Sequence, residues 1–253
     1  MTSQDCIYVS PRWEQTIRNA IDKGFIPDVH LQQQFRLALL ICRLPQLNRL
    51  LQQIESDPTH PDTPSRALYL ATEASAALAA LQEYDDTIIT FLQGSGGIIL
   101  GNCDISACSK SFNFSEPLLH EIFTHHAWAC MSTNSIVTDA LDYLGLADRV
   151  EAEAQNRAWA TRVWRSYPYA QRFKPLASIK FVLPAIVSYE WAGPVERRMI
   201  EMALNDVSSY RRPPPGGYTE APILANAKAV RGKIPFVRTQ DIEVEIRGEG
   251  ARS

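Results

Sequence analysis

The segment HEIFTHHAWAC, residues 120–130, holds three of the five histidines of the chain beside a glutamate, a tryptophan and a cysteine. Histidine titrates near neutral pH, so it serves as a general acid or base and as a metal ligand. The segment resembles the zinc motif HExxH but has one extra residue between its outer histidines. At about 100° per residue, His120 and His125 lie roughly 140° apart around a helix and cannot bind one metal ion from one face. The sequence therefore predicts no metal site here, which leaves acid–base chemistry.

Helical spacing gives this segment an apolar stripe that includes one histidine. The stripe is formed by Leu119, Ile122, Phe123, His126 and Cys130. His125 lies one turn from Glu121, an i,i+4 pair that could orient or charge its ring. Taken singly, each histidine is best interpreted as a hydrogen-bonded core residue or as a surface residue beside a carboxylate. As a group, His120, His125 and His126 are the candidate catalytic residues, because a histidine facing a helical pocket would be a good general base or acid.

Six further side chains are candidates for binding a substrate. They are Trp128, Arg162, Arg165, Tyr167, Tyr169 and Glu190. The arginines could bind a carboxylate or phenolate and the tyrosines could donate to a ligand oxygen, while the structural alternatives are a solvated helix face and ordinary packing. Glu190 ends the most apolar helix, an unusual place for a charge, so we expect it to be exposed or paired with Arg197 or Arg198. Asp85 and Asp86 are interpreted as part of a solvated helix face.

Helical periodicity and helix-ending residues recur along most of the chain, so the sequence predicts an all-α fold. Helices are expected at 11–23, 29–44, 46–56, 66–93, 116–130, 134–144, 147–167, 175–191 and 193–210. We expect one domain of roughly eight helices over residues 1–210, followed by a Pro/Gly-rich tail over 211–253 that is extended or partly disordered. Residues 98–114 have no helical period, and a short strand and an ordered loop are both open there. Within the tail, residues 241–248 alternate as a strand would.

The composition is typical of an ordinary globular protein, with 45% apolar and 21% charged residues, a net charge of −3 and a pI near 6.0. This charge argues against direct nucleic-acid binding through a basic surface. The five cysteines form no CxxC pair, so a structural zinc site is not expected and the thiols are predicted to be reduced. No phosphate-binding loop or dinucleotide fingerprint occurs, so no cofactor is expected. With neither a signal peptide nor an apolar run of about 20 residues, we expect a cytoplasmic protein that binds no membrane, or a nuclear one if it is a regulator.

Residues 171–207, QRFKPLASIKFVLPAIVSYEWAGPVERRMIEMALNDV, resemble the end of the regulatory (middle homology) domain of fungal zinc binuclear cluster transcription factors. The resemblance rests on an apolar helix with an internal proline, a small-residue turn, an acidic residue, paired arginines and a second apolar helix. These are Phe181–Trp191, Ala192–Gly193–Pro194, Glu196, Arg197–Arg198 and Met199–Leu204. The upstream segment NRAWATRVW fits loosely, so the pattern covers about the middle and C-terminal two-thirds of the chain.

This resemblance implies a large helical regulatory fold. The chain departs from the family at its start, where it has one cysteine, Cys6, in place of a six-cysteine zinc cluster, and no basic linker. DNA binding in the manner of the family is therefore not expected.

Three functions are compatible with these features. The first is a cofactor-free isomerase or cyclase acting on an apolar phenolic or polyketide-type metabolite, for example by chalcone-type ring closure, with a histidine moving the proton and Arg or Tyr stabilising the oxyanion. The second is a truncated transcription regulator that binds an inducer or a partner regulator, and the third is a structural or ligand-sequestering protein. The cluster of three histidines favours the enzyme, which we expect to bind a small apolar ligand, with a homodimer left open.

Overall fold

The computed structural model describes residues 11–102, 109–207 and 217–233. Its elements in chain order are α1 (Pro11–Asp22), α2 (Val29–Ile41), α3 (Leu44–Ser56), α4 (Thr63–Gly94), β1 (Ile98–Asn102), β2 (Lys110–Phe114), α5 (Pro117–Asp142), α6 (Arg149–Arg172), α7 (Leu176–Ser188), the 3₁₀ helix η2 (Tyr189–Trp191), α8 (Pro194–Val207) and α9 (Glu220–Val230). The predicted all-α fold is confirmed. Within these residues, no helix is both long enough and apolar enough to cross a membrane.

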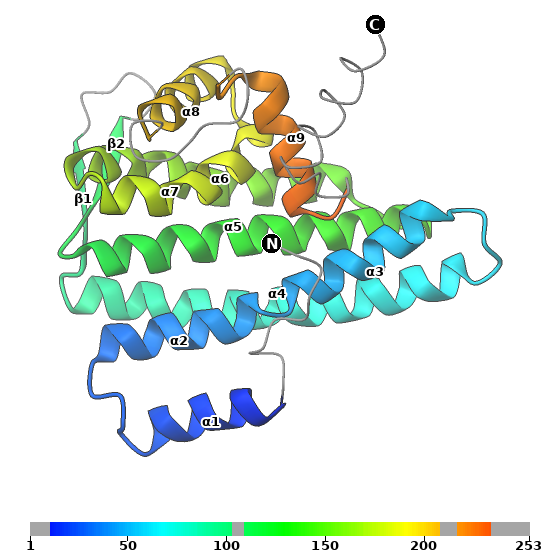
Figure 1. Cartoon of the computed structure of the whole chain (residues 1–253), viewed down its shortest axis with the longest axis horizontal. Helices are drawn as coiled ribbons and strands as arrows, with labels where there is room; N and C mark the ends of the chain where they lie inside the picture. Colours follow the sequence, from blue (N-terminus) through cyan, green and yellow to red (C-terminus); the bar gives the residue numbers. More distant parts are fainter. Residues whose placement is uncertain (1–10, 103–108, 208–216, 234–253) are drawn as a thin grey trace, which may run out of the picture.

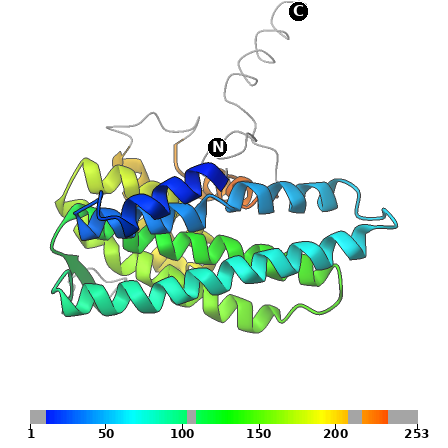
Figure 2. The ribbon, with the colours of Figure 1, turned by 90° about the horizontal axis from the view of Figure 1, so that it is seen from below.

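Helix α5 forms the centre of the molecule. Figures 1 and 2 show α4 and α5 running side by side along the long axis, with α2 and α3 on one side and α6 and α7 on the other. Helix α5 contacts α4, α6 and α7 most extensively and also touches α2 and α3. Of its 26 residues, 17 are buried. A helix buried on so many sides must satisfy its polar groups within the protein, and this requirement shapes the sites described below.

The long helix α4 packs along α5 through small side chains. Ala67 and Ala74 are completely buried, together with larger residues such as Leu70 and Leu81. Alanine has the highest helix propensity and lets a neighbouring backbone approach closely, so the Ala/Leu-rich sequence gives a helix of 32 residues. The helix ends at the predicted glycine cluster, where Gly96 has a φ of +67°.

Two predicted helix ends are absent. The residues expected to form separate helices at 116–130 and 134–144 belong to one helix, α5. The polar residues between the two predicted helices are accommodated because Thr133 donates to the Ala129 carbonyl at 2.8 Å and Ser135 donates to that of Met131 at 2.9 Å. Likewise, α6 passes through Pro168 and continues for one turn.

Residues 98–114, left open between strand and loop, contain a small antiparallel hairpin. Strand β1 pairs with β2 in a register that places Ile98 opposite Phe114 and Leu100 opposite Phe112. Strand β2 packs on α6, and Phe114 is buried there. The hairpin therefore contributes aromatic side chains to the core rather than forming a sheet of its own.

Helix α9 lies within the tail for which the sequence predicts no helix. It packs against α7 and η2, and its side chains Ile223 and Ala227 are fully buried. Its sequence, EAPILANAKAV, has good helix formers, but the proline- and glycine-rich composition around it dominated the prediction. The strand predicted at 241–248 lies outside the described residues.

The packing of α4 predicts that two leucine-to-alanine substitutions in this helix lower the free energy of unfolding by different amounts. Leu81→Ala removes a side chain that is 1% exposed, whereas Leu68→Ala removes one that is 59% exposed. We expect the first to lower the free energy of unfolding by about 2–5 kcal/mol and the second by less than about 0.5 kcal/mol. Urea unfolding followed by circular dichroism measures both, and equal costs would contradict the packing of α4 described here.

Candidate functional site

His120 lies in an aromatic cage formed by three elements. Its ring stacks on Tyr169 of α6 at a centroid distance of 5.2 Å, and Phe114 and Phe181 lie 5.3 and 6.0 Å away. The side chain is completely buried, and the backbone of Ser166 lies close enough to oppose, in part, the effect of that burial on the pKa of the ring. Burial lowers the pKa of His120 to about 3, so the ring is neutral at physiological pH.

His126 faces α4 and belongs to a buried polar network. Its Nε2 lies 2.8 Å from the Leu81 carbonyl oxygen and 3.3 Å from Cys130 Sγ. Its Nδ1 lies 3.5 Å from Asp85 Oδ1, and Arg162 donates to both oxygens of Asp85 at 2.6 and 2.8 Å. Burial lowers the pKa of His126, while the Asp85 carboxylate opposes that shift. The network ties α4, α5 and α6 together, so we assign it a structural role.

This network corrects two interpretations made from the sequence. Asp85 is not on a solvated face, because its side chain is only 16% exposed and faces the interior. Arg162 is only partly exposed, and its guanidinium is bidentate on Asp85, so a substrate would have to compete with that pair for it. The two residues are separated by 77 positions, so no local pattern connects them.

His125 is half-buried and lies beside Glu121 as expected, but its ring contacts the backbone of Glu121 rather than the carboxylate. Its Nδ1 is 2.8 Å from the Glu121 carbonyl oxygen, while the Glu121 carboxylate pairs with Lys180 at 2.9 Å. Burial lowers the pKa of His125. The neighbouring Trp128 ring meets His125 edge to face at 6.4 Å and is itself 4% exposed, with no partner for its Nε1 among the described residues.

The three histidines thus occupy three separate environments, and the structure does not bring them together. His120 and His126 are 0% and 1% exposed, so a substrate would reach either ring only after the core opened. An isomerase that used His120 or His126 would need such an opening, whereas one that used the half-buried His125 would not. Of the remaining candidates, Tyr167 and Tyr169 are buried by aromatic packing. Arg165 is half-buried and has no ion-pair partner within the described chain.

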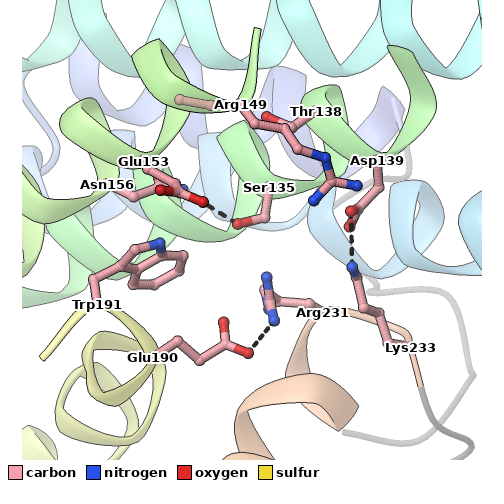
Figure 3. A pocket seen from close by; sticks show the side chains of 11 residues that line it. Ser135, Thr138, Asp139, Arg149, Glu153, Asn156, Glu190, Trp191, Arg231 and Lys233 are labelled. Atoms are coloured by element: carbon pink, nitrogen blue, oxygen red, sulfur yellow. Dashed lines mark hydrogen bonds and ion pairs between the residues drawn. The ribbon is translucent and has the colours of Figure 1, made fainter. Parts of the chain in front are cut away.

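An open, polar pocket of about 260 Å³ lies toward the other end of α5 (Figure 3). It is lined by Ser135, Thr138 and Asp139 of α5, Arg149, Ala152, Glu153 and Asn156 of α6, Glu190 and Trp191 of η2, and Arg231 and Lys233 after α9. Glu190 is the one predicted site residue in this lining. Ser135 lies nine residues beyond His126, about 13 Å along the helix axis, so the pocket is separate from the histidines.

Two ion pairs join the pocket walls. Arg231 pairs with Glu190, and Lys233 Nζ donates to Asp139 Oδ1 at 2.7 Å. The expected partner of Glu190 was Arg197 or Arg198; Arg197 instead pairs with Glu220. Burial raises the pKa of Glu190, while Arg231 and Lys233 oppose this shift.

The C-terminal end of α9 is built to hold these two cations in place. The N–H of Lys233 donates to the Lys228 carbonyl at 3.0 Å and that of Gly232 donates to the Ala229 carbonyl at 3.1 Å, which is the Schellman pattern. Gly232 has a φ of +80°, and a Cβ there would lie 2.9 Å from the Asn48 backbone oxygen. We call residues 230–233 the C-terminal clasp.

Two buried atoms at the pocket lack partners within the described residues. They are the Nε of Arg231, a donor, and the Oδ2 of Asp139, an acceptor. Arg231 is only 7% exposed, which is rare for an arginine whose donors are not all used. The sequence analysis missed both Arg231 and Asp139. For Arg231 a signal was present, because the run AKAVRGK is typical of a helix end with glycine at C′.

Within the described residues, no group of three histidine, cysteine or acidic side chains is arranged to hold a metal ion. Comparison of the chain with models of protein families, with curated proteins and with solved structures found no match. The resemblance to fungal transcription-factor regulatory domains therefore stays a prediction, and the function is argued from geometry.

The buried network predicts a pH-dependent cost for losing Arg162. Arg162→Met leaves the Asp85 carboxylate without its guanidinium, and we expect the free energy of unfolding to fall by about 2–3 kcal/mol at pH 8, less than for a fully buried pair because both side chains are partly exposed. At pH 6 the loss of stability of the variant relative to wild type should be smaller, because the unpaired Asp85 carboxylate favours protonation of His126. Urea unfolding at both pH values measures this. Arg165→Met, three residues along α6, is the control, and an equal loss there would contradict the assigned role.

The buried neutral His120 predicts that acid destabilises the fold. The pKa is near 6.5 in the unfolded chain and about 3 in the folded protein, so this contribution to stability is present above pH 6.5 and is lost as the pH falls toward 3. Between pH 7 and pH 4.5 the loss should be roughly 2–3 kcal/mol. His120→Phe should remove that part of the slope when unfolding is measured across this range. An unchanged slope would show that the ring is not held neutral.

Proposed function

We propose that the chain is a ligand-binding regulatory domain, which senses a small polar molecule in the pocket between α5, α6, η2 and the C-terminal clasp. One observation carries this proposal: a buried arginine, Arg231, lines an open pocket, and its Nε has no partner in the part of the chain that the structure describes. An unpaired buried donor costs free energy, which a ligand acceptor would recover. The proposed ligand is polar because the lining is, in contrast to the apolar metabolite expected from the sequence.

The pocket also offers a route from binding to regulation. Its lower wall in Figure 3 is made by Glu190, Arg231 and Lys233, and the last two belong to the C-terminal clasp. A ligand that binds only when the clasp is docked stabilises the docked state by mass action. Such a device suits a regulator, whose output is association with another protein, better than it suits a catalyst that relies on these histidines.

The proposal is tested by thermal unfolding of the full chain with a library of small polar metabolites. Binders should raise the melting temperature of wild type and of Arg165→Met but not of Arg231→Lys. Lysine can keep the charge opposite Glu190 but lacks the planar guanidinium, so binding should fall while the fold, checked by circular dichroism, is retained. Retention of binding by Arg231→Lys would place the site elsewhere.

The same experiment also distinguishes the isomerase hypothesis from the proposed regulatory function. Each stabilising compound is incubated with the protein and analysed for conversion. Conversion that is lost when His120, His125 or His126 is replaced by alanine would favour the isomerase, and binding without conversion would favour the regulator.

A further inference from the structure

The lining of the pocket carries charges of both signs. It has three carboxylates, Asp139, Glu153 and Glu190, and three cations, Arg149, Arg231 and Lys233, and Arg149 also pairs with Asp142 outside the lining. A ligand with only negative charge would meet three carboxylates, and a polyamine would meet three cations. A pocket that presents both signs selects against either class and favours a ligand that carries both.

The two atoms without partners in the described residues are also of both kinds. Arg231 Nε can only donate, and Oδ2 of the Asp139 carboxylate can only accept. Arg149 lies on the same upper side of the pocket in Figure 3 as Asp139, and Trp191 presents its aromatic ring at the left of the view. The guanidinium of Arg231 lies 5.7 Å from the centre of the Trp191 ring, so a charged group and an apolar surface adjoin each other.

The size of the pocket limits the ligand. A volume of about 260 Å³ would hold about eight or nine water molecules at their liquid volume, and it lies below the range of roughly 300–1,000 Å³ that is usual for drug-sized ligands. A compact metabolite of few non-hydrogen atoms fits this space.

The lining has charges of both signs, a donor and an acceptor without partners, and a small volume. From these three features we infer that the ligand is a small zwitterion of the α-amino-acid class. Its carboxylate accepts from Arg231, its ammonium group donates to Asp139, and its side chain lies along Trp191. This inference rests on the proposed function and narrows its ligand.

Isothermal titration calorimetry of the full chain with a panel of free α-amino acids tests the inference. For the tightest binder, the methyl ester removes the negative charge and the N-acetyl derivative removes the positive one. We expect each derivative to bind at least tenfold more weakly than the free amino acid.

Variants assign the two ends of the ligand. Asp139→Asn should weaken the free amino acid and its ester but add little to the weak binding of the N-acetyl derivative. Arg231→Lys should weaken the free amino acid and the N-acetyl derivative but add little for the ester. Asp86→Asn, an exposed carboxylate of α4 outside the lining, should leave all three affinities unchanged.

The outcomes separate this inference from the proposed function. Equal binding of ester, N-acetyl derivative and free amino acid would overturn the zwitterion. Binding of only singly charged or neutral library compounds, lost in Arg231→Lys, would also overturn it while leaving the proposed function intact. If no compound of any class binds, both the zwitterion and the ligand-binding function are wrong.

Discussion

The burial of α5 is the constraint on which the rest of this structure depends. A helix enclosed by α4, α6 and α7 cannot leave polar groups to water, so each must find a partner inside or lose its charge. The hydroxyl groups of Thr124, Thr133, Ser135 and Thr138 donate to carbonyls of their own helix. Asn134 donates to the Ala152 carbonyl and to Asn156 of α6. His126 is held by a carbonyl and the Asp85–Arg162 pair, whereas His120 stays neutral among aromatic rings. The histidines thus reflect how a central helix accommodates polar residues.

Access, rather than residue type, separates the two polar regions of α5. The histidine region has the groups that acid–base chemistry uses, but the rings of His120 and His126 are closed to solvent and that of His125 is half-buried. The pocket toward the other end has fewer reactive groups, yet it is open and includes a buried donor and acceptor without partners. Binding requires access before it requires chemistry, and only the second region offers it in the described structure. This difference favours a binding domain over a histidine-based enzyme.

Local signals in the sequence were sufficient for most helices and insufficient for the sites. Periodicity and breakers located α1 to α4, α7 and α8 because those signals act within a few residues. The continuity of α5 was missed because the polar run at 132–135 resembles a helix end until its hydrogen bonds are known. The Asp85–Arg162 pair and the Glu190–Arg231 pair join residues 77 and 41 positions apart, and no spacing rule reaches that far. Helix α9 was missed for a different reason, since regional composition outweighed a usable local pattern.

The C-terminal clasp explains how a pocket of this kind can be coupled to the fold. Asn48 of α3 donates to the Val230 carbonyl at 2.7 Å. Gly232 approaches Asn48 so closely that there is no room for a side chain at position 232. The Schellman turn then fixes the directions in which Arg231 and Lys233 leave the backbone, one toward η2 and one toward α5. Because the same four residues both dock α9 and supply the cations of the pocket, the proposed ligand and the docked clasp would stabilise each other by the same coupling free energy.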